Sequence, residues 1–337
     1  MARADGSLRI AKVRRSNVGA NVPQSATRRE LGDEAEVSGR SRAWIALRGN
    51  PAFWIGAVGL VVLILLALLA PILAPHNPDL QFRDNGLTAA GDPVGPSAEF
   101  LLGTDRLGRD YLSRLLFGAQ TSLTVGIGAN AIATLVGVLV GATAAYVGNR
   151  SVSRRLGRWA VRLPFPVSSL LMRATDVMLS FPALLLAIAL VAVIGPSLLL
   201  VLIVIASVMW TGTARIVYGR VLVVKELDFV EAARALGASG SRIFFGHILP
   251  HVLSLIIVYA TLGIAGTVLF EATLSYLGVG VPPPAPSWGT MIADHVGYYA
   301  TDPRLLVLPG LAIMGTILAF SLLGDALRDA LDPYNWR

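Results

Sequence analysis

Five long stretches of this sequence carry no Asp, Glu, Lys or Arg, and each is long enough to cross a membrane as a helix. About 20 helical residues span a hydrocarbon core of roughly 30 Å. The composition agrees, since 54% of the residues are hydrophobic, 15% are charged and the mean hydropathy is +0.65. The sequence therefore predicts an all-α integral membrane protein. The stretches are residues 51–75, 121–149, 177–214, 248–270 and 305–324.

The third stretch is too long for one helix and contains a natural break at Gly195, Pro196 and Ser197. Glycine favours turns and proline cannot continue a helix, so we divide the stretch into two short spans. Six transmembrane helices result, and an even number places both termini on one side of the membrane. Arginine concentrates in the N-terminal tail and in loops 150–173 and 215–242, so the positive-inside rule places these segments and both termini in the cytoplasm.

We expect three parts along the chain. Residues 1–50 form a basic, mobile cytoplasmic tail, and residues 51–120 hold the first transmembrane helix and an extracytoplasmic loop. Residues 121–337 form a five-helix core that includes a polar cytoplasmic elbow at residues 226–247. The first apolar stretch begins too late and is too long for a cleaved signal peptide. An Arg-rich stretch, residues 150–163, is interpreted as an insertion that lengthens a cytoplasmic loop.

The residue inventory excludes several functions. The formal charge of +7 comes mainly from Arg beside apolar stretches, and no aromatic and basic platform for nucleic acid is present. The chain has no Cys and its four His residues are scattered, so we predict no metal site, no disulfide and no thiol chemistry. Lys12 and Lys225 lie outside any Gly-Lys-Ser/Thr phosphate-binding motif. We therefore expect no enzyme activity and no cofactor in this chain, and any nucleotide energy must come from another subunit.

Within the apolar stretches the one ionisable residue is His251. Ion-coupled and proton-coupled carriers generally need ionisable groups at membrane depth, so this scarcity counts against a secondary carrier. His251 itself is either a hydrogen-bonded packing residue or a proton relay.

The elbow has the pattern of two short helices. Asp228 and Glu231 have the spacing of a capping box that starts a helix, and Gly237 supplies the left-handed residue that ends it. Ser239 or Ser241 can cap a second helix that leads toward the fifth span. Because the elbow combines small alanines with phenylalanines, it either docks a partner protein or lies on lipid headgroups as an amphipathic segment.

A ridge of small residues runs along the second span. Gly137 and Gly141 form a GxxxG pair, and Ala133 and Ala145 extend the ridge by one turn at each end. Such a ridge lets two helix backbones approach closely in lipid. We interpret it as a helix-packing surface, belonging either to a moving helix pair or to a static one.

The elbow sequence EAARALGASGSRIFFGHILP, residues 231–250, resembles the EAA signature of ABC importer permeases, E-A-A-x3-G-x9-I-x-L-P. Its HILP ending is similar to the dipeptide, oligopeptide and nickel branch, in particular to the second permease of those systems. The matching residues are Glu231, Ala232, Ala233, Gly237, Leu249 and Pro250, whereas His247 stands where the signature has Ile. Strings at residues 101–123, 176–197, 270–280, 286–292 and 324–333 also resemble this family, and together they cover most of residues 50–335.

The resemblance implies the type I ABC importer permease fold in the bacterial inner membrane. It also implies a homologous permease that completes the pore as a heterodimer, two ABC ATPases that bind ATP and Mg, and an extracytoplasmic solute-binding protein. In this family the elbow contains the coupling helix, which we assign to residues 231–245. The residues assigned to ATPase coupling are Asp228, Glu231, Ala232, Ala233, Gly237, Ala238, Ser239, Arg242 and Phe245.

The family leaves the solute open. Di- or oligopeptides are the first expectation, and nickel or another small solute is the alternative. Outside the family, the sequence would also suit a stand-alone carrier or channel, or a membrane scaffold that transports nothing.

Residues of the two outer loops are the remaining candidates. Asp105, Arg109 and Asp110 form a salt-bridged turn that supports the structure, or they contact the solute or the solute-binding protein. Glu271, at the outer end of the fifth span, belongs to an external gate or stays hydrated at the membrane interface. Trp288 follows a run of prolines, where it anchors at the headgroups or helps to form a docking surface for the solute-binding protein.

Overall fold

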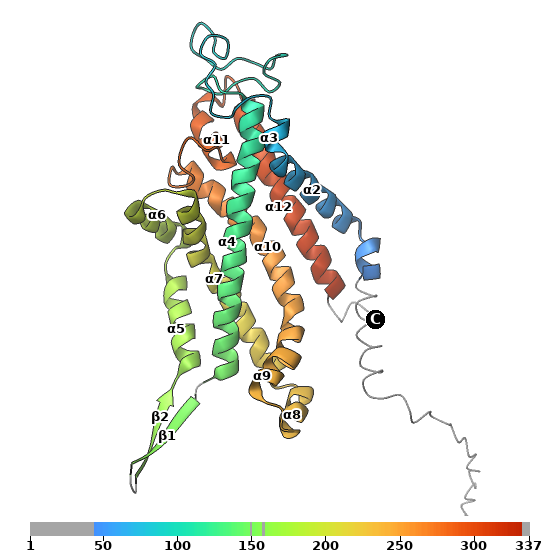
Figure 1. Ribbon diagram of the computed structural model, residues 1–337, viewed down its shortest axis with the longest axis vertical. Helices are drawn as coiled ribbons and strands as arrows, with labels where there is room; N and C mark the ends of the chain where they lie inside the picture. The colour runs from blue at the N-terminus through green and yellow to red at the C-terminus, as the bar shows by residue number, and fades with distance from the viewer. Residues whose placement is uncertain (1–43, 149, 157–158, 332–337) are drawn as a thin grey trace, which may run out of the picture.

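The computed structural model describes residues 44–148, 150–156 and 159–331, which form a tall bundle of helices (Figure 1). Within these ranges the one sheet is a two-stranded hairpin. The elements are α2 (Pro51–Leu68), α3 (Ala70–Leu73), α4 (Tyr111–Val147), β1 (Arg150–Leu156), β2 (Trp159–Phe165), α5 (Val167–Ser180), α6 (Ala183–Ile194), α7 (Leu198–Val224), α8 (Asp228–Ala235), α9 (Gly240–Ile243), the π-helix η1 (Phe244–Ile248), α10 (Leu249–Tyr276), α11 (Trp288–His295), the 3-10 helix η2 (Val296–Tyr298) and α12 (Arg304–Leu331).

Five helical segments of the described chain are long and apolar enough to cross a membrane: α2, α4, α7, α12 and the continuous run Gly240–Tyr276. The sixth candidate is the pair α5 and α6, which is bent by 88°. The prediction of one helix over residues 177–194 is therefore wrong, because Pro182 has no N–H with which to continue α5. The second break is confirmed, since Gly195 has a φ of +98° and the Ser197 side chain caps α7.

The bundle is all-helical as predicted, and the hairpin is an addition that lies in the segment interpreted as an insertion, residues 150–163. β1 and β2 pair antiparallel, from Arg150↔Phe165 to Leu156↔Trp159. Valine and aromatic residues favour extended backbone, and β2 contains Trp159, Val161 and Phe165, whereas β1 contains Val152 alone of these types. The hairpin projects from the same end of the bundle as α8 and α9 (Figure 1). Most of the predicted mobile tail, residues 1–43, lies outside the described residues.

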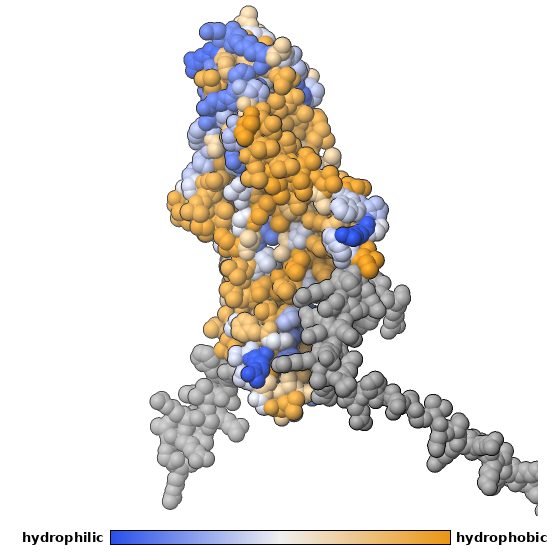
Figure 2. Space-filling model, turned by 45° about the vertical axis from the view of Figure 1, so that its right-hand side comes forward, coloured by the Kyte–Doolittle hydropathy of each residue, from blue (hydrophilic) through white to orange (hydrophobic). Residues whose placement is uncertain are grey.

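Polar residues gather at the two ends of the bundle. Figure 2 shows an apolar belt over the middle and hydrophilic residues over one end. That end holds the loop between α3 and α4 together with α11, whereas the elbow lies at the opposite end (Figure 1). The 37-residue α4 runs between the two ends.

The small-residue ridge of α4 packs against α7, as the GxxxG pattern predicted. A Cβ atom added to Gly141 would lie 2.3 Å from the Ala214 carbonyl oxygen, and one on Gly137 would lie 2.6 Å from Thr213 Cβ. Lipid supplies no hydrophobic driving force between helices, so this close backbone approach is a main source of packing energy.

We predict that Gly141→Ala destabilises the bundle by about 1–3 kcal/mol, because the added methyl group must push α4 away from α7. Gly212→Ala is the matched control, since no atom lies within 4 Å of a Cβ at Gly212. Thermal unfolding of the two purified variants in detergent measures the difference. Equal melting temperatures would show that the ridge is not under packing constraint.

Candidate coupling elbow and outer polar cluster

The first helix of the elbow, α8, begins where predicted but without the predicted capping box. Leu227 is the N-cap residue (φ −76°, ψ 147°), and no side chain caps the helix. Asp228 is therefore the first helical residue rather than the cap. Both Asp228 and Glu231 still lie in the first turn, where the helix dipole favours negative charge.

α8 ends in a Schellman motif at Gly237, as predicted from its glycine. Gly237 has a φ of +78°, a conformation that strains any residue with a side chain. The Ala238 N–H donates to the Ala233 carbonyl at 3.1 Å, and the Gly237 N–H donates to the Arg234 carbonyl at 3.0 Å. These two bonds satisfy carbonyls that the helix end would otherwise leave free.

The second helix of the elbow continues into the membrane without a break. Ser239 occupies the N-cap position of α9 but makes no capping hydrogen bond with its side chain. α9, η1 and α10 then form one helical run, Gly240–Tyr276. The π-helical turn η1 directly precedes Pro250, whose missing N–H and bulky ring a regular α-helix accommodates poorly. The elbow is therefore rigidly joined to a transmembrane segment.

Buried residues hold the elbow in place while two large apolar side chains face outward. Val230 and Ile243 are buried in a cluster with residues of α4, α7 and α10. The Tyr146 hydroxyl of α4 donates to the Gly240 carbonyl at 2.7 Å. Leu236 is 86% exposed and Phe245 is 66% exposed. Of the other predicted coupling residues, Asp228, Glu231, Ala232, Gly237, Ser239 and Arg242 are exposed, and Ala233 and Ala238 are half-buried.

His251 connects the two helices of the elbow region. Its ring stacks on Phe229 of α8 with centroids 4.6 Å apart, and its Nδ1 lies 2.8 Å from the His247 carbonyl oxygen. This geometry supports the packing interpretation of His251. The stacked pair also fixes α8 to α10, a contact that the sequence did not predict.

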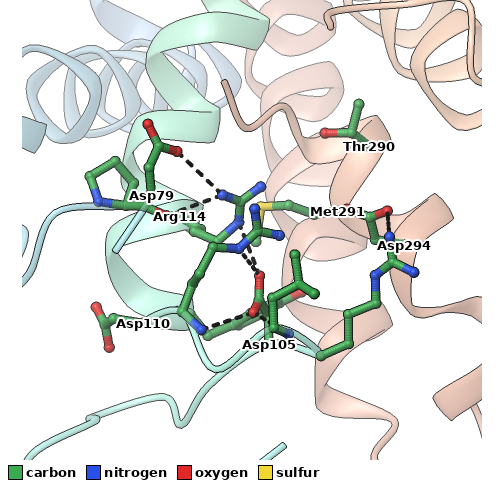
Figure 3. A network of polar contacts seen from close by, with 12 residues as sticks. Asp79, Asp105, Asp110, Arg114, Thr290, Met291 and Asp294 are labelled. Atoms are coloured by element: carbon green, nitrogen blue, oxygen red, sulfur yellow. Dashed lines mark hydrogen bonds and ion pairs between the residues drawn. The ribbon is translucent and has the colours of Figure 1, made fainter. Parts of the chain in front are cut away.

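At the opposite end, an outer cluster joins two buried arginines to one carboxylate (Figure 3). Arg109 Nε lies 2.6 Å from Asp105 Oδ2, and Arg114 Nε lies 3.4 Å from the same oxygen. Asp105 Oδ1 accepts the backbone N–H groups of Leu107 and Arg109 at 2.8 and 2.9 Å. The salt-bridged turn is thus confirmed for Asp105 and Arg109, with Gly108 at a φ of +73°. Sequence reasoning missed Arg114, one turn into α4.

Asp110 is the N-cap residue of α4 and makes no close ion pair with either arginine. Its Oδ2 accepts the backbone N–H and the hydroxyl of Ser113 at 2.8 and 2.6 Å. His76 Nδ1 lies 4.0 Å from that oxygen. Asp110 therefore fixes where α4 begins, and its predicted place in the ion-paired turn is corrected.

Glu271 and Trp288 are buried, contrary to the interfacial roles predicted for them. Glu271 is 0% exposed, so it is not a hydrated interfacial carboxylate, and its Oε1 accepts the Ser275 hydroxyl at 2.7 Å. Trp288 is 1% exposed, its Nε1 donates to the Leu115 carbonyl at 3.1 Å, and its backbone N–H donates to Ser122 Oγ at 3.2 Å. Trp288 fastens α11 to α4 instead of anchoring at the headgroups.

We predict that Asp105→Asn destabilises the outer end by about 3–5 kcal/mol, because it leaves two buried guanidinium groups without their shared carboxylate. Asp294→Asn is the control, since it breaks an ion pair with Arg106 whose side chains are 47% and 30% exposed. That change should cost less than about 1 kcal/mol. Thermal unfolding of both variants measures the two losses, and losses of equal size would contradict the prediction.

His295, at the end of α11, lies where burial favours the neutral form of its ring. Burial lowers the pKa of His295 below its ordinary value of 6.5. Its Nδ1 donates to the Met291 carbonyl at 2.6 Å, which leaves Nε2 to accept the Arg106 backbone N–H at 3.4 Å. Protonation would remove that acceptor.

We therefore predict an acid-sensitive outer end. Because the unfolded chain binds a proton near pH 6.5 and the folded chain does so only at lower pH, the stability supplied by His295 is complete above about pH 6.5 and declines as the pH falls below it. Melting temperatures at pH 7.5 and 5.5 should differ more for the natural chain than for His295→Gln. The same pH dependence in both chains would assign the effect to other groups.

Comparison with known proteins matches this architecture to a family. The model for binding-protein-dependent transport system inner membrane components matches residues 137–336, and the model for the N-terminal transmembrane domain of oligopeptide transport permease C matches residues 40–90. The chain is 40% identical over 290 residues to the di/tripeptide transport system permease DppC of Pseudomonas aeruginosa (strain UCBPP-PA14), covering 86% of this chain and 90% of that protein. It is 39% identical over 290 residues to the glutathione transport system permease GsiD of Escherichia coli (O6:K15:H31, strain 536), covering 86% and 89%. The chain therefore belongs to the family of binding-protein-dependent transport system inner membrane components.

Proposed function

We propose that this chain is a permease subunit of an ATP-driven importer for di- or oligopeptides, forming half of the translocation pore. The observation that carries the proposal is the continuity of the elbow with a transmembrane helix. Leu236 and Phe245 present apolar contacts on the elbow, and the helical run Gly240–Tyr276 extends from it through the membrane. At 1.5 Å per residue, a run of that length spans roughly 55 Å.

The mechanism follows from this rigid connection. A separate ATPase that grips the elbow and closes on ATP would tilt or shift the run as one body, because α8 is fixed to it through Phe229 and His251. α10 packs against α4 and α12, so its movement changes the packing at the pore. This is an alternating-access change of packed helices, with no covalent chemistry in this subunit. ATP and Mg would bind to the ATPase, and we assign no cofactor to this chain.

The orientation and assembly complete the proposal. The elbow and the Arg-rich segments face the cytoplasm under the positive-inside rule, so the outer cluster faces the solute-binding protein. If α5 and α6 together cross the membrane, the count is six and both termini are cytoplasmic. A homologous permease would complete the pore as a heterodimer, with two ATPases below it and the solute-binding protein above.

The peptide substrate rests on related permeases, which are named as parts of di/tripeptide, dipeptide and glutathione transport systems. Nickel or another small solute is not favoured by these names. A stand-alone carrier would transport solute in liposomes without any other protein, whereas this chain should be inert until its ATPases and second permease are added.

We predict that Glu231→Lys or Gly237→Pro leaves the protein in the membrane but uncouples ATP hydrolysis from uptake. Proline fixes φ near −65° and lacks an N–H, so it cannot occupy a residue at +78° that donates a hydrogen bond. Peptide uptake by the reconstituted complex should fall at least about tenfold, since a tenfold loss needs only about 1.4 kcal/mol of transition-state stabilisation.

Asp92→Lys is the control, because it reverses an exposed charge at the other end of the molecule. Its uptake and its coupling should match those of the natural complex. Normal uptake in Glu231→Lys and Gly237→Pro would refute the coupling role of the elbow.

A further inference from the structure

Beside the outer cluster lies a hollow of about 40 Å³ between α4, α11 and the proline-rich loop before α11. Three of its lining residues, Arg114, Thr290 and Asp294, are labelled in Figure 3. Its polar floor is formed by Arg109 and Arg114, which are buried, and Thr290 and Asp294 lie on the α11 side. The remaining lining residues are Val281, Pro283, Pro284 and Ala285.

The two arginines have more donor groups than the protein around them satisfies. The Arg109 side chain donates a hydrogen bond through its Nε, whereas its Nη1 and Nη2 donate none to the described residues. Arg114 donates from Nη1 to the Pro78 carbonyl at 3.1 Å, and its buried Nε is paired with Asp105 Oδ2 at 3.4 Å without forming a hydrogen bond. A guanidinium group can donate two parallel hydrogen bonds to a carboxylate. The free N–H groups of these arginines therefore form a donor site for an anion.

The acidic residues nearby are already engaged. Asp105 is shared by both arginines, and Asp110 caps α4. Asp294 lines the hollow but is paired with Arg106 at 2.8 Å, and the 44% exposed Asp79 lies 3.7 Å from Arg114 Nη1. None of these carboxylates reaches Arg109 Nη1 or Nη2. The prolines of the opposite wall have no N–H, so an incoming anion would meet the arginines as its donors.

The size and the position of the hollow indicate which chemical group binds in it. A hollow of about 40 Å³ has room for a group of the size of a carboxylate. The hollow lies beside α11 at the outer end of the bundle, which is the end that Figure 2 shows to be hydrophilic. We propose that it receives an acidic side chain of the solute-binding protein when that protein docks. This proposal rests on the function proposed above.

The test uses the complete complex in nanodiscs together with its solute-binding protein, and it measures the Kd between them. Arg109→Gln should raise the Kd at least tenfold, because it removes the Nη1 and Nη2 groups that would donate to the incoming carboxylate. Arg109→Lys, which keeps the charge but loses the fork, should give an intermediate value. Arg83→Gln, an exposed arginine of the same outer loop, is the matched control and should change the Kd less than threefold.

Each other outcome overturns the proposal in a recognisable way. An unchanged Kd in Arg109→Gln would show that the outer cluster only stabilises the fold and does not bind the solute-binding protein. A raised Kd that appears only in nanodiscs with anionic phosphatidylglycerol, and not with phosphatidylcholine alone, identifies a lipid headgroup as the occupant. A normal Kd with weaker peptide uptake identifies the carboxylate of the solute. If the natural complex binds no solute-binding protein at all, the proposed function fails before this test begins.

A second measurement avoids any change in the arginines. The chain has no Cys, so Ala285→Cys at the exposed rim places a single thiol beside the hollow. A short thiol-reactive photocrosslinker at that position should capture the solute-binding protein within a few residues of an Asp or Glu. Capture at a site without an acidic residue, or no capture by a complex that binds normally, overturns the proposal.

Discussion

Hydrocarbon offers the backbone no hydrogen-bond partners, and this constraint separates the molecule into an apolar middle and two polar ends. In the middle, helices satisfy their own backbone and pack through small residues such as Gly137 and Gly141 of α4. At the outer end, polar side chains fix the start of α4. Asp105 forms an ion pair with Arg109, and Asp110 caps the helix. Any signal between the ends must therefore travel along helices, because within residues 44–148, 150–156 and 159–331 the segments that cross the apolar belt are helical.

The elbow is built to pass displacement into one of those helices. α9 and α10 are joined by a π-helical turn instead of a loop, so the turn that accommodates Pro250 does not act as a free hinge. The stack of Phe229 on His251 ties α8 to the same run. At the far end of the run, Ser275 Oγ accepts the Val281 backbone N–H at 3.4 Å, and α10 packs against α11. Both ends of the run are thus fastened to other elements, which is what a mechanical connection requires.

Local sequence signals predicted the local structure well. The break at Gly195, the end of α8 at Gly237 and the α4 ridge all depend on residues close together in the chain, and all are confirmed. The prediction of a capping box was wrong because Leu227, and not Asp228, is the N-cap residue. The spacing of two acidic residues does not decide between these two neighbouring positions. Arg114, Trp288 and Glu271 were missed or misplaced because their surroundings come from distant segments. Trp288, for example, is buried by α4 through bonds to Leu115 and Ser122, more than 160 residues away.

In our proposal, the outer cluster both stabilises the outer end and binds an acidic side chain. If one carboxylate were paired with one arginine, the charge of that arginine would be neutralised. Such a pair would leave no donor group for a ligand. Here Asp105 serves two buried guanidinium groups through one oxygen while its other oxygen accepts backbone N–H groups, so its capacity is exhausted before the arginines are satisfied. The rigid turn prevents the arginines from turning to solvent instead. Because an incoming carboxylate would meet donors that are already oriented, it would bind with little of the ordering cost that flexible surface arginines incur.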